Sequence, residues 1–343
     1  MAILTSTVEP ASADPKAPRC QPWRGASDDA ITDSAELRRL VGLPPGTSSS
    51  CGENGEFPLL VPRTLLGRIR PGDPKDPVLL QVLPQTVEAI DHPGFTKDPL
   101  AEAGAAQSPG LLRKYQDRLL IVASGTCAVH CRFCFRRHFP CGDSPRTLEE
   151  WEAIVGEIAA AESVREVILS GGDPLTLADE FLAWLAKRLA EIPQLTRLRV
   201  HTRFPIMVPQ RVTDGLLAWL RGTRLATFVV VHVNHPAEID EAVGEALTRL
   251  VEAGIPVLSQ SVLLGGVNDR VEVLASLFER LADLRVMPYY LHQLDRVAGA
   301  AHFEVPEHVG IELVRQLRTR LPGYAVPRYV RQPPSGPSKL VLA

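Results

Sequence analysis

Three cysteines lie close together in the stretch "TCAVHCRFCFRRHFP", residues 126–140. Cys127, Cys131 and Cys134 have the spacing C-x3-C-x2-C, which lets one loop surround a single metal centre with three thiolates. Three interpretations follow. The cysteines could form a zinc site completed by His138, or they could be buried without a metal. The third interpretation is a 4Fe-4S cluster with one iron left open for a substrate or cofactor.

The surroundings of this loop favour the open cluster. The motif "SGGDPL", residues 170–175, ends the next predicted strand. Its glycines allow close backbone approach, and Asp173 offers a carboxylate to an ammonium group. A structural zinc site normally fills all four positions within a compact element, whereas this loop follows a strand at the edge where α/β proteins bind ligands.

The elements that position these residues begin after residue 115, where short aliphatic runs alternate with amphipathic stretches of helical length. Six strands are predicted, at residues 119–125, 166–172, 197–202, 227–233, 256–264 and 285–291. Six βα units in series indicate a parallel sheet, either doubly wound or curled into a partial barrel. Polar residues follow the strand ends, where such folds bind ligands: Ser170 to Asp173, His201 to Arg203, His232 to His235, Gln260, and His292 to Asp295.

The 343 residues suit one large domain with extensions. We expect a disordered tail at 1–22, a helical and proline-rich wrapping arm at 23–115, and a core at 116–320 followed by a C-terminal segment at 321–343. Within the arm, "TDSAELRRLVGL" predicts a short helix capped by Thr32 or Asp33.

Composition excludes several classes of protein. With 37 Lys and Arg against 40 Asp and Glu, the net charge of −3 provides no field for collecting nucleic acid. The sequence has no 18-residue apolar run and no secretory signal pattern, so we expect neither a membrane protein nor a secreted one. A cytoplasmic protein keeps its thiols reduced, which favours a metal or catalytic role for the cysteine cluster. Cys20, Cys51 and Cys141 have no role that the sequence supports.

Six motifs in consistent order resemble the radical S-adenosylmethionine family in its lysine 2,3-aminomutase branch. They are "CAVHCRFCFRRHFP", "SGGDPL", "HTRFPIMVPQRVT", "VHVNHPAEI", "QSVLLGGVND" and "GPSK". The resemblance runs from about residue 23 to residue 339 and is strongest to the shorter bacterial members, the elongation factor P lysine 2,3-aminomutases. It implies a partial (β/α)6 barrel of the TIM type and an isomerase that uses a 4Fe-4S cluster, S-adenosylmethionine and pyridoxal phosphate.

The resemblance also assigns cofactor residues. The cluster would be held by Cys127, Cys131 and Cys134, with S-adenosylmethionine chelating the open iron; Cys141 is discounted as a fourth ligand because it would block that iron. Contacts to S-adenosylmethionine are expected from Gly171, Gly172, Asp173, His232 and Gln260. Pyridoxal phosphate is expected to form a Schiff base with Lys339, with Tyr115 against its ring and Lys114 and Arg118 at its phosphate. Lys114 stands where these enzymes commonly carry arginine, so it keeps the charge but loses a bidentate contact.

Three further residues would bind the substrate. Arg136 matches the arginine that pairs with the α-carboxylate, while Arg137 is expected on the surface. Asp295 matches one of two carboxylates that bind the ε-ammonium of lysine. The second position is Gln332, a neutral residue that can still accept a hydrogen bond. A glutamate substrate is disfavoured because its second carboxylate would face Asp295.

The expected reaction is the conversion of α-lysine to β-lysine by a radical route, with the product passed to a separate ligase that attaches it to elongation factor P. The alternatives are a 2,3-aminomutase for another amino acid, a stand-alone metabolic aminomutase, a radical enzyme without pyridoxal phosphate, or a non-catalytic zinc module. An external electron donor is required. The sequence leaves open whether the chain forms a homo-oligomer.

Overall fold

The computed structural model describes residues 29–44, 57–139, 144–334, 336 and 338–343. The expected N-terminal tail, part of the arm and the remaining cysteines, Cys20, Cys51 and Cys141, lie outside the described residues. No helix in the described part of the chain is long and apolar enough to cross a membrane.

The core is one sheet whose ten strands follow chain order from β1 to β10. Seven of them are parallel: β3 (Arg118–Ser124), β4 (Glu166–Gly171), β5 (Arg197–Thr202), β6 (Ala226–His232), β7 (Val257–Val262), β8 (Met287–His292) and β9 (Arg328–Arg331). Antiparallel strands extend both edges: β1 (Ala106–Ser108) and β2 (Leu111–Leu112) at one, and β10 (Leu340–Val341) at the other. In the described chain β1 and β10 do not pair, so the sheet stays open. The expected partial barrel is confirmed, and its six predicted strands are β3 to β8.

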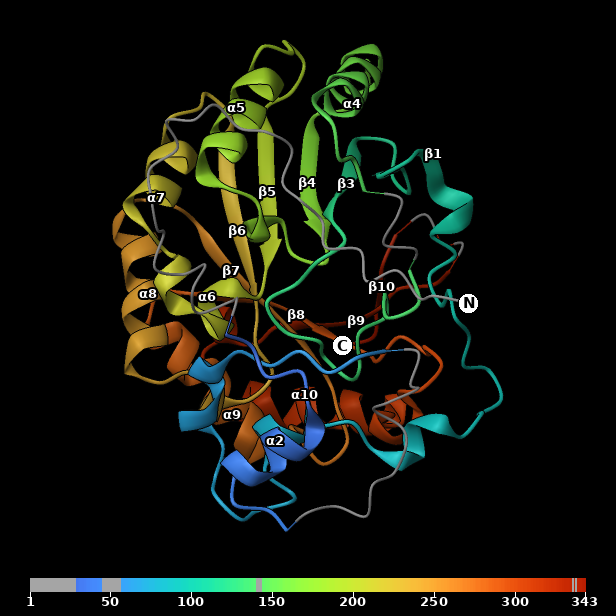
Figure 1. Cartoon of the computed structure of the whole chain (residues 1–343), viewed down its shortest axis with the longest axis vertical. Helices are drawn as coiled ribbons and strands as arrows, with labels where there is room; N and C mark the ends of the chain where they lie inside the picture. Colours follow the sequence, from blue (N-terminus) through green and yellow to red (C-terminus); the bar gives the residue numbers. More distant parts are fainter. Residues whose placement is uncertain (1–28, 45–56, 140–143, 335, 337) are drawn as a thin grey trace.

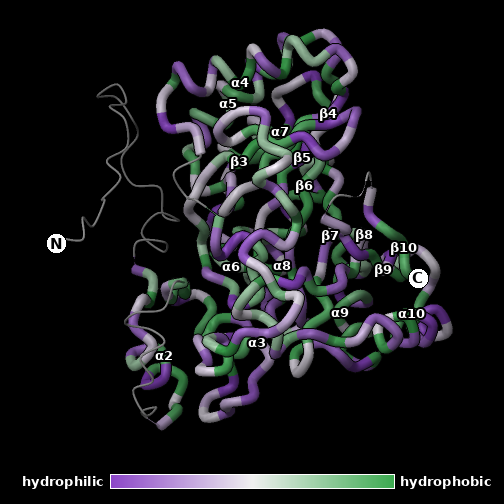
Figure 2. The backbone as a smooth tube through the Cα atoms, turned by 90° about the vertical axis from the view of Figure 1, so that its right-hand side faces the viewer, coloured by the Kyte–Doolittle hydropathy of each residue, from purple (hydrophilic) through white to green (hydrophobic). Residues whose placement is uncertain are grey.

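Helices cover the outside of the curved sheet (Figure 1). They are α4 (Leu148–Ala160), α5 (Asp179–Ala190), α7 (Asp214–Arg221), α8 (Glu241–Glu252), α9 (Val271–Asp283) and α10 (Glu307–Arg320). In α4 the buried residues Trp151, Ile154, Val155 and Ile158 form a single stripe at helical spacing. Figure 2 shows hydrophobic residues concentrated along the central strands of the sheet.

The strands direct alternate side chains to the two faces of the sheet. In β7 the residues Val257, Ser259 and Ser261 are buried, whereas Leu258, Gln260 and Val262 are half-buried on the other face. Parallel pairing places His232 of β6 opposite Gln260 of β7. The two predicted cofactor contacts are therefore neighbours at the carboxyl ends of adjacent strands.

The N-terminal arm lies below the strands of the barrel in the view of Figure 1. It contains α2 (Ser34–Leu40), α3 (Pro77–Leu80) and three short 3-10 helices, η1 (Arg63–Arg68), η2 (Thr86–Ala89) and η3 (Ala103–Ala105). The predicted helix is confirmed as α2, and the side chain of Asp33 caps it by accepting a hydrogen bond from the Ala35 backbone. Apolar arm residues such as Leu37, Val61 and Leu79 are buried in the same core as the barrel.

Candidate active site

The cysteine loop follows β3 and is held from below by the arm. The backbone N–H groups of His130 and Arg132 donate to the carbonyl oxygens of Leu60 and Gln81, at 2.9 and 2.8 Å. Cys131 is buried and the other two thiols are half-buried, and all three are free. The arm therefore fixes the loop on which the three sulfurs sit.

Two arginines of this loop have structural partners. Arg132 and Arg137 both pair with Glu88, at 2.5 and 2.9 Å, and their guanidinium groups lie 5.1 and 5.0 Å from the ring centroid of Phe57. The side chain of Arg137 is only 6% exposed, so the expectation of a surface residue was wrong. Sequence reasoning missed this because Glu88 is far away in the chain, in η2 of the arm.

The two glycines at the end of β4 make room for the start of the cysteine loop. A Cβ on Gly172 would lie 2.1 Å from the carbonyl oxygen of Thr126, and Gly171 has a φ of +122°. The backbones are also hydrogen-bonded, because Gly172 N–H donates to Ser124 at 2.7 Å and Asp173 N–H donates to Thr126 at 2.8 Å. Glycine is therefore required here by the approach of two backbones.

Asp173 is buried and ties the ends of β4 and β5 together. Its carboxylate accepts hydrogen bonds from the Thr202 hydroxyl at 2.8 and 2.9 Å, from Arg203 N–H at 2.6 Å and from Leu175 N–H at 3.0 Å. Burial raises the pKa of this carboxyl to about 6, although the hydrogen bonds from these donors act to lower it. The contact of Asp173 with the ammonium of S-adenosylmethionine stays a prediction, and the observed role is to brace two strand ends.

The cysteine residues fit an iron–sulfur cluster better than a zinc ion. His138, the expected fourth zinc ligand, instead lies with Nε2 3.1 Å from the carbonyl oxygen of Ala298. A cubane carries its ligands on different irons, so its three thiolates need not meet at a point. Burial raises the pKa of the Cys134 thiol to about 11, so bound iron would be needed to hold these sulfurs as thiolates.

His232 stands at the rim as a neutral imidazole. Burial and the nearby Arg203 lower its pKa to about 3, and its Nε2 lies 3.2 Å from Asn234 Oδ1. Its ring meets Phe133 of the cysteine loop edge to face, with centroids 5.6 Å apart. Gln260 is adjacent on β7, so the geometry brings both predicted contacts beside the loop.

Lys339 points back into the barrel from the C-terminal segment. Its Nζ donates to Gln332 Oε1 at 3.0 Å, and the same oxygen accepts the Tyr115 hydroxyl at 3.1 Å. Burial lowers the pKa of Lys339 to about 8, because desolvation outweighs the attraction of Asp295. A lysine with a lowered pKa is partly neutral near physiological pH, as a nucleophilic amine must be.

Other cations surround Lys339. Arg118 stacks over the Tyr115 ring at 4.4 Å and pairs with Asp117, while the Lys114 ammonium donates to the carbonyl of Leu100. Arg199 was not singled out from the sequence, yet it is buried on β5, pairs with Glu166 at 3.1 Å and depresses the pKa of Lys339. A charged residue inside a buried strand is the signal that could have identified it.

Arg136 already has an anionic partner. Its guanidinium pairs in a bidentate manner with Glu102, both distances being 2.8 Å, and also donates to the Ser170 hydroxyl at 3.0 Å. Glu102 comes from the arm and was missed in the sequence. The contact of Arg136 with a substrate carboxylate stays a prediction, in which Glu102 would orient the guanidinium.

Asp295 follows β8, close to these charges. Burial raises the pKa of Asp295 to about 7, although Lys339, Lys114 and Arg136 all oppose this shift. The carboxyl is therefore partly protonated near neutral pH, and a cation placed against it would favour its ionised form.

The open α/β barrel, with three thiols on the loop after its first parallel strand, defines a radical S-adenosylmethionine enzyme. The profile of the radical SAM superfamily matches residues 121–278. The chain is 42% identical to the L-lysine 2,3-aminomutase of Haemophilus influenzae, covering 94% of this chain and 96% of that one. It is 41% identical to the Escherichia coli enzyme of the same name, over 95% of each, and 38% identical to that of Clostridium subterminale, over 92% of this chain and 76% of that one.

The chain therefore belongs to the lysine 2,3-aminomutase family, whose members are isomerases. Enzymes of this family use a 4Fe-4S cluster, S-adenosylmethionine and pyridoxal phosphate. The non-catalytic zinc module is wrong, because it conflicts both with this membership and with the position of His138.

Gly172→Ala tests how the loop depends on the end of β4. The added methyl must displace the backbone of Thr126 next to Cys127, so we expect at least a fivefold loss of iron and sulfide bound after anaerobic reconstitution. Iron and sulfide assays measure this, and circular dichroism monitors the fold. Gly156→Ala in α4 is the control, since nothing lies within 4 Å of its added Cβ. If Gly172→Ala binds as much iron and sulfide as the wild type, the cysteine loop does not depend on this glycine.

The reactivity of Lys339 should follow its lowered pKa. Imine formation with pyridoxal phosphate, trapped by borohydride and mapped by peptide mass spectrometry, should rise with pH to a midpoint of about 8. An ordinary lysine titrates near pH 10.4. The exposed Lys187 provides the internal reference. Equal pH profiles for the two lysines would show that burial does not activate Lys339.

Proposed function

We propose that this chain converts α-lysine to β-lysine, with Lys339 holding pyridoxal phosphate. The single observation that supports this most strongly is the Lys339 amine, which is half-buried, has its pKa lowered to about 8 and is attracted by the Asp295 carboxylate. The three named relatives each carry the name L-lysine 2,3-aminomutase, which supports lysine as the substrate.

The cofactors supply the radical and the electrophilic carbonyl when bound, and the chain supplies their positions. Cys127, Cys131 and Cys134 would hold the iron. His232 and Gln260, together with the backbone of Gly171 and Gly172, line the adjacent rim where S-adenosylmethionine is expected. In this proposal the bound cofactors and substrate would complete the barrel wall and exclude water, and exclusion of water protects a radical from side reactions.

Arg118, Lys114 and Tyr115 would receive the phosphate and ring of pyridoxal phosphate. Gln332 accepts hydrogen bonds from both Tyr115 and Lys339. In this proposal Gln332 therefore orients the lysine amine, in addition to any contact with substrate. This second role compensates for the absence of a carboxylate at position 332.

Substrate binding would use two charges of opposite sign. Arg136, oriented by Glu102, would take the α-carboxylate, and Asp295 would take the ε-ammonium. Binding of that ammonium would favour the ionised form of Asp295, which is partly protonated near pH 7. The site would therefore select a basic amino acid over an acidic one.

We further propose that the β-lysine is used to modify elongation factor P through a separate ligase, in the cytoplasm and with electrons from an external donor. The length of the chain supports this assignment. It covers 96% and 95% of the Haemophilus influenzae and Escherichia coli relatives but 76% of the Clostridium subterminale relative, so it has the length of the shorter members.

The reaction is tested with anaerobically reconstituted enzyme, both cofactors, a reductant and lysine. We expect β-lysine by chromatography and mass spectrometry, a borohydride-reducible adduct at Lys339, and at least a hundredfold loss of product in Lys339→Ala. Lys187→Ala is the matched control and should keep full activity. Rearrangement of another amino acid without β-lysine would overturn the substrate, and the absence of the adduct would overturn the role of Lys339.

Asp295→Asn tests selection of the ε-ammonium. Removing the charge should raise the KM for lysine at least tenfold with a smaller effect on kcat. In the wild type, KM should rise as the pH falls below about 7, because protonation of Asp295 removes the anion, and the variant should lack this dependence. Asp283→Asn, at the exposed end of α9, is the control. An unchanged KM in Asp295→Asn would place the ε-ammonium elsewhere.

A further inference from the structure

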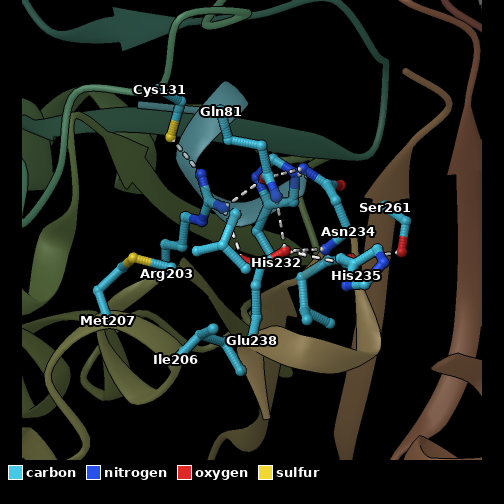
Figure 3. Close-up of polar contacts among 12 residues, drawn as sticks. Gln81, Cys131, Arg203, Ile206, Met207, His232, Asn234, His235, Glu238 and Ser261 are labelled. Atoms are coloured by element: carbon cyan, nitrogen blue, oxygen red, sulfur yellow. Dashed lines mark hydrogen bonds and ion pairs between the residues drawn. The ribbon is translucent and has the colours of Figure 1, made fainter. Parts of the chain in front are cut away.

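A buried polar network lies directly behind Cys131 (Figure 3). Nη1 of Arg203 donates a hydrogen bond to the Cys131 sulfur, and Nη2 donates to Glu238 Oε2 at 2.7 Å and to Gln81 Oε1 at 2.8 Å. The guanidinium also lies 5.6 Å from the ring centroid of Phe133, within the same cysteine loop. One side chain therefore contacts both a thiol and the loop that carries it.

Arg203 is fixed from several directions. Its backbone N–H donates to Asp173, which places the residue at the end of β5. The Arg203 side chain is 5% exposed and that of Glu238 is 0% exposed, so water does not screen this pair. The guanidinium cannot rotate away without leaving a buried carboxylate unpaired.

Gln81 connects this network to the arm. The side-chain NH2 group of Gln81 donates to Glu238 at 3.1 Å and to the Pro77 carbonyl at 3.0 Å. The backbone carbonyl of Gln81 accepts a hydrogen bond from the backbone N–H of Arg132 in the cysteine loop. Glu238 is held in turn by the backbone N–H groups of Asn234 and His235, both at 2.9 Å. The network has a defined order, in which the cation lies next to the sulfur and the carboxylate lies behind the cation.

We propose that Arg203 is a positioning residue that holds Cys131 and raises the reduction potential of the 4Fe-4S cluster, while Glu238 limits this effect. Arginine stays protonated in proteins, so Arg203 carries a permanent charge beside the sulfur. Hydrogen bonds to cluster sulfurs and the local net charge set the potential of such clusters. A buried cation next to the ligand stabilises the reduced cluster, which carries one more negative charge than the oxidised cluster.

The chemical step is a one-electron reduction. One electron passes from a low-potential reductant to the oxidised cluster, no bond forms or breaks, and no proton is transferred. The inference rests on the cluster that the family uses and not on lysine as substrate. The role of Arg203 can therefore be correct even if lysine is not the substrate, and lysine can be the substrate even if Arg203 does not affect the cluster.

Three variants of the full chain test the proposal. Glu238→Gln keeps Arg203 and removes its counter-charge, so the cluster should become easier to reduce. The double variant Arg203→Gln with Glu238→Gln removes both charges without leaving either unpaired, so the cluster should become harder to reduce. Asp179→Asn is the control, because Asp179 is also paired with a buried arginine but is held by Thr213 and Trp219.

The measurement is a potentiometric titration with titanium(III) citrate, followed by electron paramagnetic resonance, on protein with verified iron and sulfide and without S-adenosylmethionine or lysine. At the midpoint reduction potential of the wild-type cluster, the ratio of reduced to oxidised cluster should be at least threefold higher in Glu238→Gln than in the wild type. It should fall at least tenfold in the double variant, which is 59 mV for a one-electron couple. Asp179→Asn should stay within twofold of the wild type.

Opposite shifts in the two Glu238 variants support the proposal, because a merely structural role would not produce shifts of opposite sign. Ratios within twofold of the wild type in both, with iron and sulfide retained, overturn it. If the double variant does not retain iron, Glu238→Gln decides alone: a rise supports the proposal, and no change or a fall overturns it.

Discussion

The structure depends on the close approach of two backbones at the carboxyl ends of β3 and β4. Gly172 lies so near Thr126 that no side chain fits between them, and hydrogen bonds from Gly172 and Asp173 lock the approach. Asp173 then extends the same unit to β5 through Thr202 and Arg203. Three strand ends and the start of the cysteine loop are thus joined by hydrogen bonds into one unit, and such support is what a site for a reactive intermediate requires.

Charge neutralisation by the arm is the second organising feature. Three carboxylates form ion pairs with arginines in or near the cysteine loop. Glu88 pairs with Arg132 and Arg137 of the loop, and Glu102 pairs with Arg136 of the loop. Glu238 pairs with Arg203, which contacts the loop from the end of β5. Two of these carboxylates, Glu88 and Glu102, belong to the arm. Buried charges are costly unless paired, so the loop could not keep this arrangement without the arm. The arm is therefore part of the site as well as a cover for the barrel.

The two ends of the site differ in their electrostatics. Around the cysteine loop, each arginine described above has a fixed partner, and the neighbouring histidine His232 stays neutral. Around Lys339, burial moves the pKa values of an amine and a carboxyl toward neutrality, to about 8 for Lys339 and about 7 for Asp295. The first arrangement suits a bound iron–sulfur cluster, because the charges of the protein groups around the cluster do not change near neutral pH. The second suits groups that must exchange protons or pair with a charged substrate.

The sequence by itself determined the order of strands β3 to β8, the three thiols and their loop, and the family, because these depend on local patterns and spacing. It did not reveal that Arg137 is buried, that Glu102 pairs with Arg136, or that Arg203 donates to Cys131. Each of these contacts joins residues at least 34 positions apart. Only the tertiary structure decided them, since the free energy of a buried charge depends on which distant group desolvates it and which one neutralises it.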